Sequence, residues 1–113
     1  MCGIAGVHFK NGASNAEMDA IAAHFIRALR HRGPDGQGVH RGFAGVFVGV
    51  RLAIVDRQGG GQPMHSESGT RGIVYNGEIY NHEELRSDLG GHTPFRTASD
   101  TEVVLTNWCV HGE

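Results

Sequence analysis

The sequence predicts an α+β fold in which a long helix packs against short strands that pair antiparallel. Ser14 and Glu17 form a capping box in front of apolar residues that recur at helical spacing from Met18 to Leu29. Short runs rich in valine, isoleucine and phenylalanine are typical of strands. The connections between these runs are short, which favours antiparallel pairing.

Each expected element has its own local signals. The first apolar run ends at the turn dipeptide Asn11-Gly12, and the long helix ends before Gly33-Pro34. Asn81 with Glu84 is expected to cap a second helix. In chain order we expect a strand at 3–9, a helix at 14–29, strands at 43–50, 52–55 and 72–75, and helices at 81–89 and 100–110, the last capped by Ser99 or Asp100.

Glycine is unusually frequent, with 18 residues in a chain of 113, against an ordinary share of about 7%. The glycines follow no fixed period, which excludes a collagen-like chain. They gather at residues 33–38, 59–61 and 90–91, between segments expected to be regular structure. We therefore expect these three clusters to form loops.

Length and charge favour one folded domain over residues 1–113. The 10 basic and 12 acidic residues give a net charge of −2 without a block of like charge, so we expect no nucleic-acid or membrane-surface partner. The sequence has no signal-peptide pattern and no apolar stretch of about 20 residues, which predicts a cytoplasmic protein. In that reducing compartment Cys2 and Cys109 are expected to remain thiols, with Cys109 packed beside Trp108.

Cys2 directly follows the initiator methionine, and removal of Met1 would leave an α-amine on the same residue as the thiol. An α-amine titrates near neutral pH and can accept the proton of a neighbouring thiol. This position therefore indicates a nucleophile that carries its own base. The alternative is a small apolar residue that opens a buried strand.

Asn76-Gly77 is a second local signal with two interpretations. The dipeptide is typical of a tight hairpin turn. It also combines a side-chain amide with the backbone N–H of a residue that a ligand can approach closely, and these donors suit the oxyanion of an acyl-transfer reaction. The sequence around the dipeptide leaves both interpretations open.

Six short blocks occur in a fixed order along the chain. They are residues 2–6 (CGIAG), 29–35 (LRHRGPD), 51–56 (RLAIVD), 61–64 (GQPM), 75–81 (YNGEIYN) and 99–103 (SDTEV). Together they closely resemble the class II, or N-terminal-nucleophile, glutamine amidotransferase family, and within it the glutaminase domain of asparagine synthetases. The resemblance implies an Ntn-hydrolase-type αββα sandwich of antiparallel sheets, of which residues 1–113 are expected to form a truncated N-terminal part.

The resemblance implies catalytic roles for three residues. Cys2 matches the nucleophile that attacks the side-chain amide of glutamine, with its α-amine as base. Asn76 and the N–H of Gly77 match the oxyanion hole, and Asn76 also contacts the substrate. The implied reaction releases ammonia and forms a thioester that water hydrolyses to glutamate.

Five further residues match substrate-binding positions of the family. Arg51 matches the residue that holds the α-carboxylate, and Glu78 and Asp100 match the acceptors for the α-ammonium group. Ile54 and Val55 match positions whose backbone lines the pocket. Taken singly, Arg51 and Glu78 have an alternative as solvated charges, and Asp100 as a helix cap.

The resemblance implies no cofactor for glutamine hydrolysis, because ATP and Mg²⁺ belong to a synthetase domain that this sequence does not contain. The eight histidines lack the spacing of a zinc site, so no metal is expected. His31, inside the second block, is expected to fix loop geometry.

Two classes of function remain open from the sequence. The first is a glutaminase module that supplies ammonia for amide-bond synthesis. The second is an inactive remnant that acts as a glutamine-binding or protein-interaction module. A third alternative, an N-terminal-cysteine hydrolase of other amides, fits Arg51, Glu78 and Asp100 less well. Because strands of the family sandwich are missing, we expect self-association or a partner chain or domain that completes it.

Overall fold

Strand β3 (Gly45–Arg51) is the centre of a three-stranded antiparallel sheet. The computed structural model describes residues 2–42, 44–53, 58–91 and 94–112. Strand β1 (Gly3–His8) pairs with one edge of β3, with Gly3 opposite Val50, and β2 (Gly36–Gly42) pairs with the other edge, with Gly38 opposite Gly49. This register places the start of β1 beside the end of β3.

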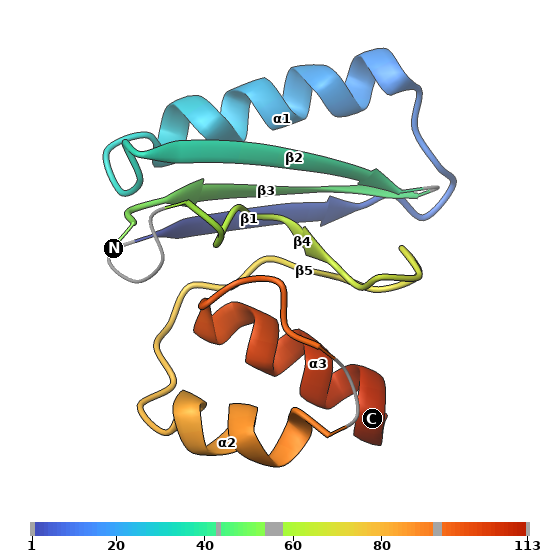
Figure 1. Cartoon of the computed structure of the whole chain (residues 1–113). Coiled ribbons are helices and arrows are strands. Elements are labelled where there is room, and N and C mark those ends of the chain that lie inside the picture. The colour runs from blue at the N-terminus through green and yellow to red at the C-terminus, as the bar shows by residue number, and fades with distance from the viewer. Residues whose placement is uncertain (1, 43, 54–57, 92–93, 113) are drawn as a thin grey trace.

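Helix α1 (Asn15–Leu29) covers one face of this sheet (Figure 1). The predicted capping box is confirmed, because the Ser14 hydroxyl accepts from Glu17 N and the Glu17 carboxylate accepts from Ser14 N. The Ser14 backbone N–H and then its hydroxyl hold the pKa of Glu17 below the ordinary value. The core between helix and sheet consists of Met18, Ala22, Val46, Val48 and Val50, which are at most 3% exposed.

A second, smaller sheet and two helices lie on the other side of the three-stranded sheet. Strands β4 (Met64–His65) and β5 (Gly72–Ile73) pair antiparallel. Helices α2 (His82–Leu89) and α3 (Asp100–His111) pack against each other, and α3 contacts β4 and β5. Figure 1 therefore shows four layers in the order α1, large sheet, small sheet, and α2 with α3. The coarse prediction of an α+β fold with antiparallel sheets is confirmed.

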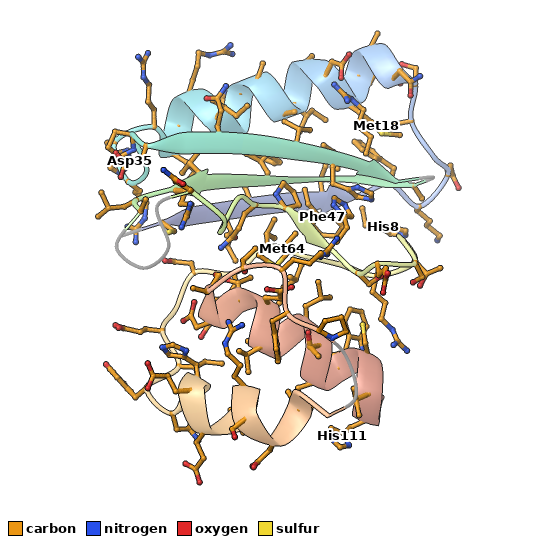
Figure 2. The ribbon with its side chains drawn as sticks, viewed as in Figure 1. His8, Met18, Asp35, Phe47, Met64 and His111 are labelled. Carbon is orange, nitrogen blue, oxygen red and sulfur yellow. The ribbon has the colours of Figure 1, made fainter. Side chains whose placement is uncertain are left out.

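The two sides of the large sheet face different layers. Figure 2 shows Met18 on the α1 side, whereas Phe47 and Met64 lie between the large sheet and the α2–α3 layer. On this second side the backbone of residues 62–63 lies directly on the sheet. A Cβ atom on Gly38 would lie 2.1 Å from the Gln62 carbonyl oxygen, and one on Gly49 would lie 3.1 Å from Gln62 Cβ. Glycine is therefore required at position 38, and a side chain at position 49 would crowd Gln62.

The structure corrects the predicted strands. Gly36–Gly42 form β2, although Gly36 and Gly38 were expected to lie in a loop. Contact with residues 62–63 favours glycine at position 38 within this strand. Strand β4 was not predicted, and β5 ends at Ile73 rather than residue 75. The expected strand at 52–55 is wrong for residues 52 and 53, which follow β3 in irregular structure, while 54 and 55 lie outside the described residues.

The helices agree more closely with the sequence. Helices α1 and α3 lie within one or two residues of the expected ranges. Asn81 occupies the N-cap position of α2, but its side chain makes no capping hydrogen bond, which corrects that prediction. Cys109 is exposed rather than packed, because its side chain lies on the solvent side of α3. No helix within the described ranges is long and apolar enough to cross a membrane.

Gly33 provides a test of the packing around β3. It is buried, and an added Cβ atom would lie 2.3 Å from Arg51 N and 2.4 Å from Val50 C. Gly33→Ala should lower the free energy of unfolding by about 3 kcal/mol, because the neighbouring atoms are backbone and cannot rotate away. Urea denaturation measures this change.

Gly61→Ala is the matched control. A Cβ atom on Gly61 would meet no heavy atom within 4 Å, so the free energy of unfolding should stay within about 1 kcal/mol of the wild-type value. Equal effects of the two substitutions would contradict the packing of Gly33 against β3.

Candidate active site

A cavity of about 300 Å³ opens between the large sheet and the N-terminus of α3. This volume is at the lower end of the range for small-molecule sites. Six of the eight residues expected from the sequence line it: Cys2, Arg51, Asn76, Gly77, Glu78 and Asp100. The other two, Ile54 and Val55, lie outside the described residues.

Cys2 lies at the start of β1, beside the end of β3. Its thiol is partly buried and donates to the Leu52 carbonyl oxygen, with a distance of 3.7 Å between Sγ and O. Its own carbonyl oxygen accepts from Arg32 Nε at 3.1 Å. Arg32 therefore holds the Cys2 backbone, and the thiol lies beside Leu52.

The segment 32–35 fixes both strand ends at the cavity. Besides the contact of Arg32 with Cys2, the backbone N–H of Asp35 donates to Arg51 O at 3.0 Å. The Asp35 carboxylate accepts from Ala53 N at 2.8 Å. Contrary to expectation, His31 is exposed, and the structure assigns loop geometry to Arg32, Gly33 and Asp35 because their groups face the strands.

Arg51 extends from the end of β3 towards the N-terminus of α3. A Cβ atom on the buried Gly60 would lie 2.5 Å from Arg51 Nη2 and 3.2 Å from Ser99 Oγ. Gly60 therefore provides the space that the guanidinium group occupies. The side chain presents a planar cation with several donors, which suits a carboxylate.

Asn76 and Gly77 lie on an irregular segment after β5 and do not join two paired strands, so the hairpin alternative is wrong. Tyr75 N donates to Gln62 Oε1 at 2.7 Å, which fixes the residue before Asn76. The Tyr75 ring covers Gly77, where an added Cβ atom would lie 2.6 Å from the phenol oxygen. The side chains of Asn76 and Glu78 are exposed and make no hydrogen bond within the described part of the chain.

Asp100 is a buried carboxylate in the first turn of α3. It is 8% exposed, and its Oδ2 atom accepts from Ile79 N at 3.1 Å. Ser99 caps the helix, because its hydroxyl accepts from Thr101 N, so the alternative that Asp100 is the cap is wrong. Asp100 joins α3 to the segment that carries Gly77 and Glu78.

The cavity therefore combines a thiol, amide donors, a cation and two carboxylates. Burial, then the charge of Asp100 and then that of Glu78, raise the pKa of Tyr75 above its ordinary value. The phenol stays neutral at physiological pH. This set can bind a zwitterionic amino acid and present its side-chain carbonyl to a nucleophile.

Several residues had not been expected at the site: Arg32, which contacts Cys2, and Gln62, Tyr75, Ser99 and Thr101, which line the cavity wall. All of them belong to the blocks that carry the family resemblance, so the blocks were the available signal. Within the described residues, no group of three or more His, Cys, Asp or Glu side chains is placed to hold a metal ion.

The comparisons with known proteins agree on one family. A family described as "Glutamine amidotransferase domain" matches residues 1–113. The chain is 44% identical over its full length to an asparagine synthetase [glutamine-hydrolyzing] of Sandersonia aurantiaca, and covers 21% of that protein. It is 40% identical to asparagine synthetase B [glutamine-hydrolyzing] of Escherichia coli (strain K12), with 93% of the chain and 19% of that protein aligned. The chain thus spans about a fifth of the length of these curated relatives.

The environment of Tyr75 can be tested by absorbance titration of tyrosinate. The component that disappears in Tyr75→Phe should titrate above 10.0, the ordinary value. Glu78→Gln should move this component to lower pH, because the variant removes a negative charge that opposes ionisation of the phenol. A Tyr75 component at or below 10.0 would place the phenol away from the two carboxylates.

Proposed function

Because the chain belongs to the glutamine amidotransferase domain family, we propose that it hydrolyses the side-chain amide of L-glutamine to glutamate and ammonia. The observation that carries this proposal is the convergence of six residues from separate segments on one cavity. The order of the four layers supports an Ntn-hydrolase-type αββα sandwich, of which residues 1–113 form the N-terminal part.

The reaction begins at Cys2. After removal of Met1, the α-amine takes the thiol proton and the thiolate attacks the amide carbon of glutamine. The Asn76 side-chain amide and the N–H of Gly77 donate to the resulting oxyanion. Return of the proton to the amide nitrogen expels ammonia and leaves a thioester at Cys2. Water then attacks the thioester and releases glutamate and the thiol.

Charge complementarity places the substrate in the cavity. Arg51 binds the α-carboxylate through its guanidinium group, and Glu78 and Asp100 accept from the α-ammonium group. Backbone contacts of Ile54 and Val55 with the substrate remain predictions. These steps need no metal or cofactor. This chain is similar to part of the longer glutamine-hydrolysing asparagine synthetases. Within a polypeptide of that kind, the released ammonia would serve amide-bond synthesis.

The two cysteines allow a paired test of the nucleophile. Cys2→Ala should reduce glutaminase activity at least 1,000-fold, because no other thiol lines the described cavity wall. Cys109→Ala should keep wild-type activity, since Cys109 is exposed on α3. Ammonia release measures both, and mass spectrometry of the active protein should show Cys2 as the first residue. Activity in a chain that retains Met1, or equal losses in both variants, would contradict the mechanism.

Asn76 and Arg51 should affect different kinetic constants. Asn76→Ala should lower kcat about 100-fold with little change in KM, because the oxyanion forms only during reaction. Arg51→Ala should mainly raise KM, since the α-carboxylate is present in the ground state and the transition state alike. Steady-state kinetics with glutamine distinguish the two, and the reverse pattern would exchange the roles.

A protein-interaction function is supported by apolar side chains on the large sheet. Ile4 and Phe47 are 43% and 48% exposed on the side away from α1, and β1 and β2 are edge strands of this sheet. The small sheet and the α2–α3 layer lie on this same side, and we propose that a second copy or another domain covers the apolar surface at Ile4 and Phe47 that they leave exposed. Light scattering during size-exclusion chromatography should show a mass that rises with concentration, and Ile4→Ser should reduce the rise. A monomer with full activity at micromolar concentration would contradict this proposal.

A further inference from the structure

The cavity has two halves: the large sheet, which carries Cys2 and Arg51, and the part formed by β4, β5 and α3 with the Asn76–Gly77 segment. Gln62 lies between these two halves and contacts both. We propose that Gln62 is a positioning residue that sets the Asn76–Gly77 segment relative to the Cys2 thiol. This inference rests on the proposed glutaminase function. It concerns how the oxyanion donors are held in place, and Gln62 itself does not act on the substrate.

The backbone of Gln62 is seated on the large sheet. A Cβ atom on Gly38 would lie 2.1 Å from the Gln62 carbonyl oxygen and 2.9 Å from its carbonyl carbon. A Cβ atom on Gly49 would lie 3.1 Å from Gln62 Cβ. The two glycines are paired on β2 and β3, so Gln62 lies against a rigid part of the sheet that ends at Arg51.

The side chain of Gln62 reaches in the other direction. Its Oε1 atom accepts from Tyr75 N at 2.7 Å, and its Nε2 atom donates to Thr101 Oγ1 at 3.4 Å. One amide group thus supplies the acceptor for the backbone N–H and the donor for the hydroxyl. Thr101 is 3% exposed and lies in the first turn of α3, so its hydroxyl is a fixed partner.

The position of this link matters because the reacting groups come from different halves. Cys2 and Arg51 lie at strand ends of the large sheet, whereas Asn76 and Gly77 follow β5. In the described part of the chain, no strand of one sheet pairs with a strand of the other. The distance from the thiol to the oxyanion donors therefore depends on side chains and loops between the sheets.

Among the described residues, the other contacts between the two sheets do not hold the Asn76–Gly77 segment directly. The His40 and His65 rings share a hydrogen bond of 2.8 Å between Nδ1 and Nε2, which ties β2 to β4. Arg51 packs on Gly60 near Ser99. Gln62 is bound to the residue immediately before Asn76, so loss of its acceptor would release this segment at the cavity wall.

Gln62→Met tests the proposal, because methionine has a similar length but lacks both hydrogen-bonding groups. It should lower kcat for glutamine hydrolysis by about 100-fold, the usual cost of a misplacement of about 1 Å, and change KM less than about threefold. Gln62→Glu keeps an acceptor for Tyr75 N, so it should recover most of the lost kcat. The Tyr75 amide should exchange with solvent faster in Gln62→Met than in Gln62→Glu.

Gln37→Met is the matched control, since Gln37 lies exposed on β2 and contacts none of these groups. It should leave kcat, KM and Tyr75 exchange at wild-type values. If Gln62→Met does not fold by circular dichroism, Gln62→Asn replaces it. This variant is one methylene too short to reach Tyr75 N, and it should show the same loss of kcat.

The outcomes separate this inference from the proposed function. A wild-type chain that hydrolyses no glutamine would overturn both. An active wild type with kcat of Gln62→Met, or of its replacement, within threefold of normal would overturn only the positioning role. An equal loss of kcat in Gln62→Glu and Gln62→Met would do the same, since the acceptor for Tyr75 would then be irrelevant.

Discussion

The contact between the Gln62 backbone and the large sheet is the constraint on which the architecture depends. Glycines at positions 38 and 49 allow a peptide backbone to lie directly on β2 and β3, because a Cβ atom on Gly38 would clash with the Gln62 carbonyl and one on Gly49 would crowd Gln62 Cβ. The loop that follows Gly61 thereby lies on the large sheet and leads into the second layer. Strands β4 and β5 and helix α3 continue from it, so the cavity is formed where this contact brings the two halves together.

Strand β3 serves packing and chemistry at the same time. Its valines, Val46, Val48 and Val50, form the core against α1, while Arg51 at its end lines the cavity. The segment 32–35 packs against this strand end through Gly33 and also holds Cys2 through Arg32. A change that loosens β3 therefore alters the packing of the core against α1 and the positions of the Arg51 guanidinium and of Cys2 together. This coupling brings Cys2 and Arg51 together at one end of the sheet, although they lie far apart in the sequence.

The predictions from sequence succeeded where the determining interactions are local. The capping box of α1 involves residues three positions apart, and its apolar face repeats at helical spacing, so both were visible in the sequence. The sequence predicted a loop at the start of β2, gave no sign of β4 and placed the end of β5 two residues late, because the pairing of glycine-containing or very short strands depends on what packs against them. Tyr75 does not extend β5, since its N–H is bound by the side chain of Gln62.

For the site, the sequence by itself determined which chemical groups are present: a thiol beside the N-terminus, an Asn-Gly pair, an arginine and two carboxylates, in blocks that identify the family. Their spacing along the chain carries no distance in space, because residues 2, 51, 76 and 100 meet only through strand register and layer packing. The tertiary structure alone decided that six of them share one cavity, that Asp100 is buried below its helix cap, and that Arg32, Gln62 and Tyr75 hold the neighbouring segments. The physical reason is that these partners are bound across long sequence separations: Arg32 meets Cys2 only when the large sheet forms, and Gln62 lies on that sheet while it binds Tyr75 only when the two sheets are stacked.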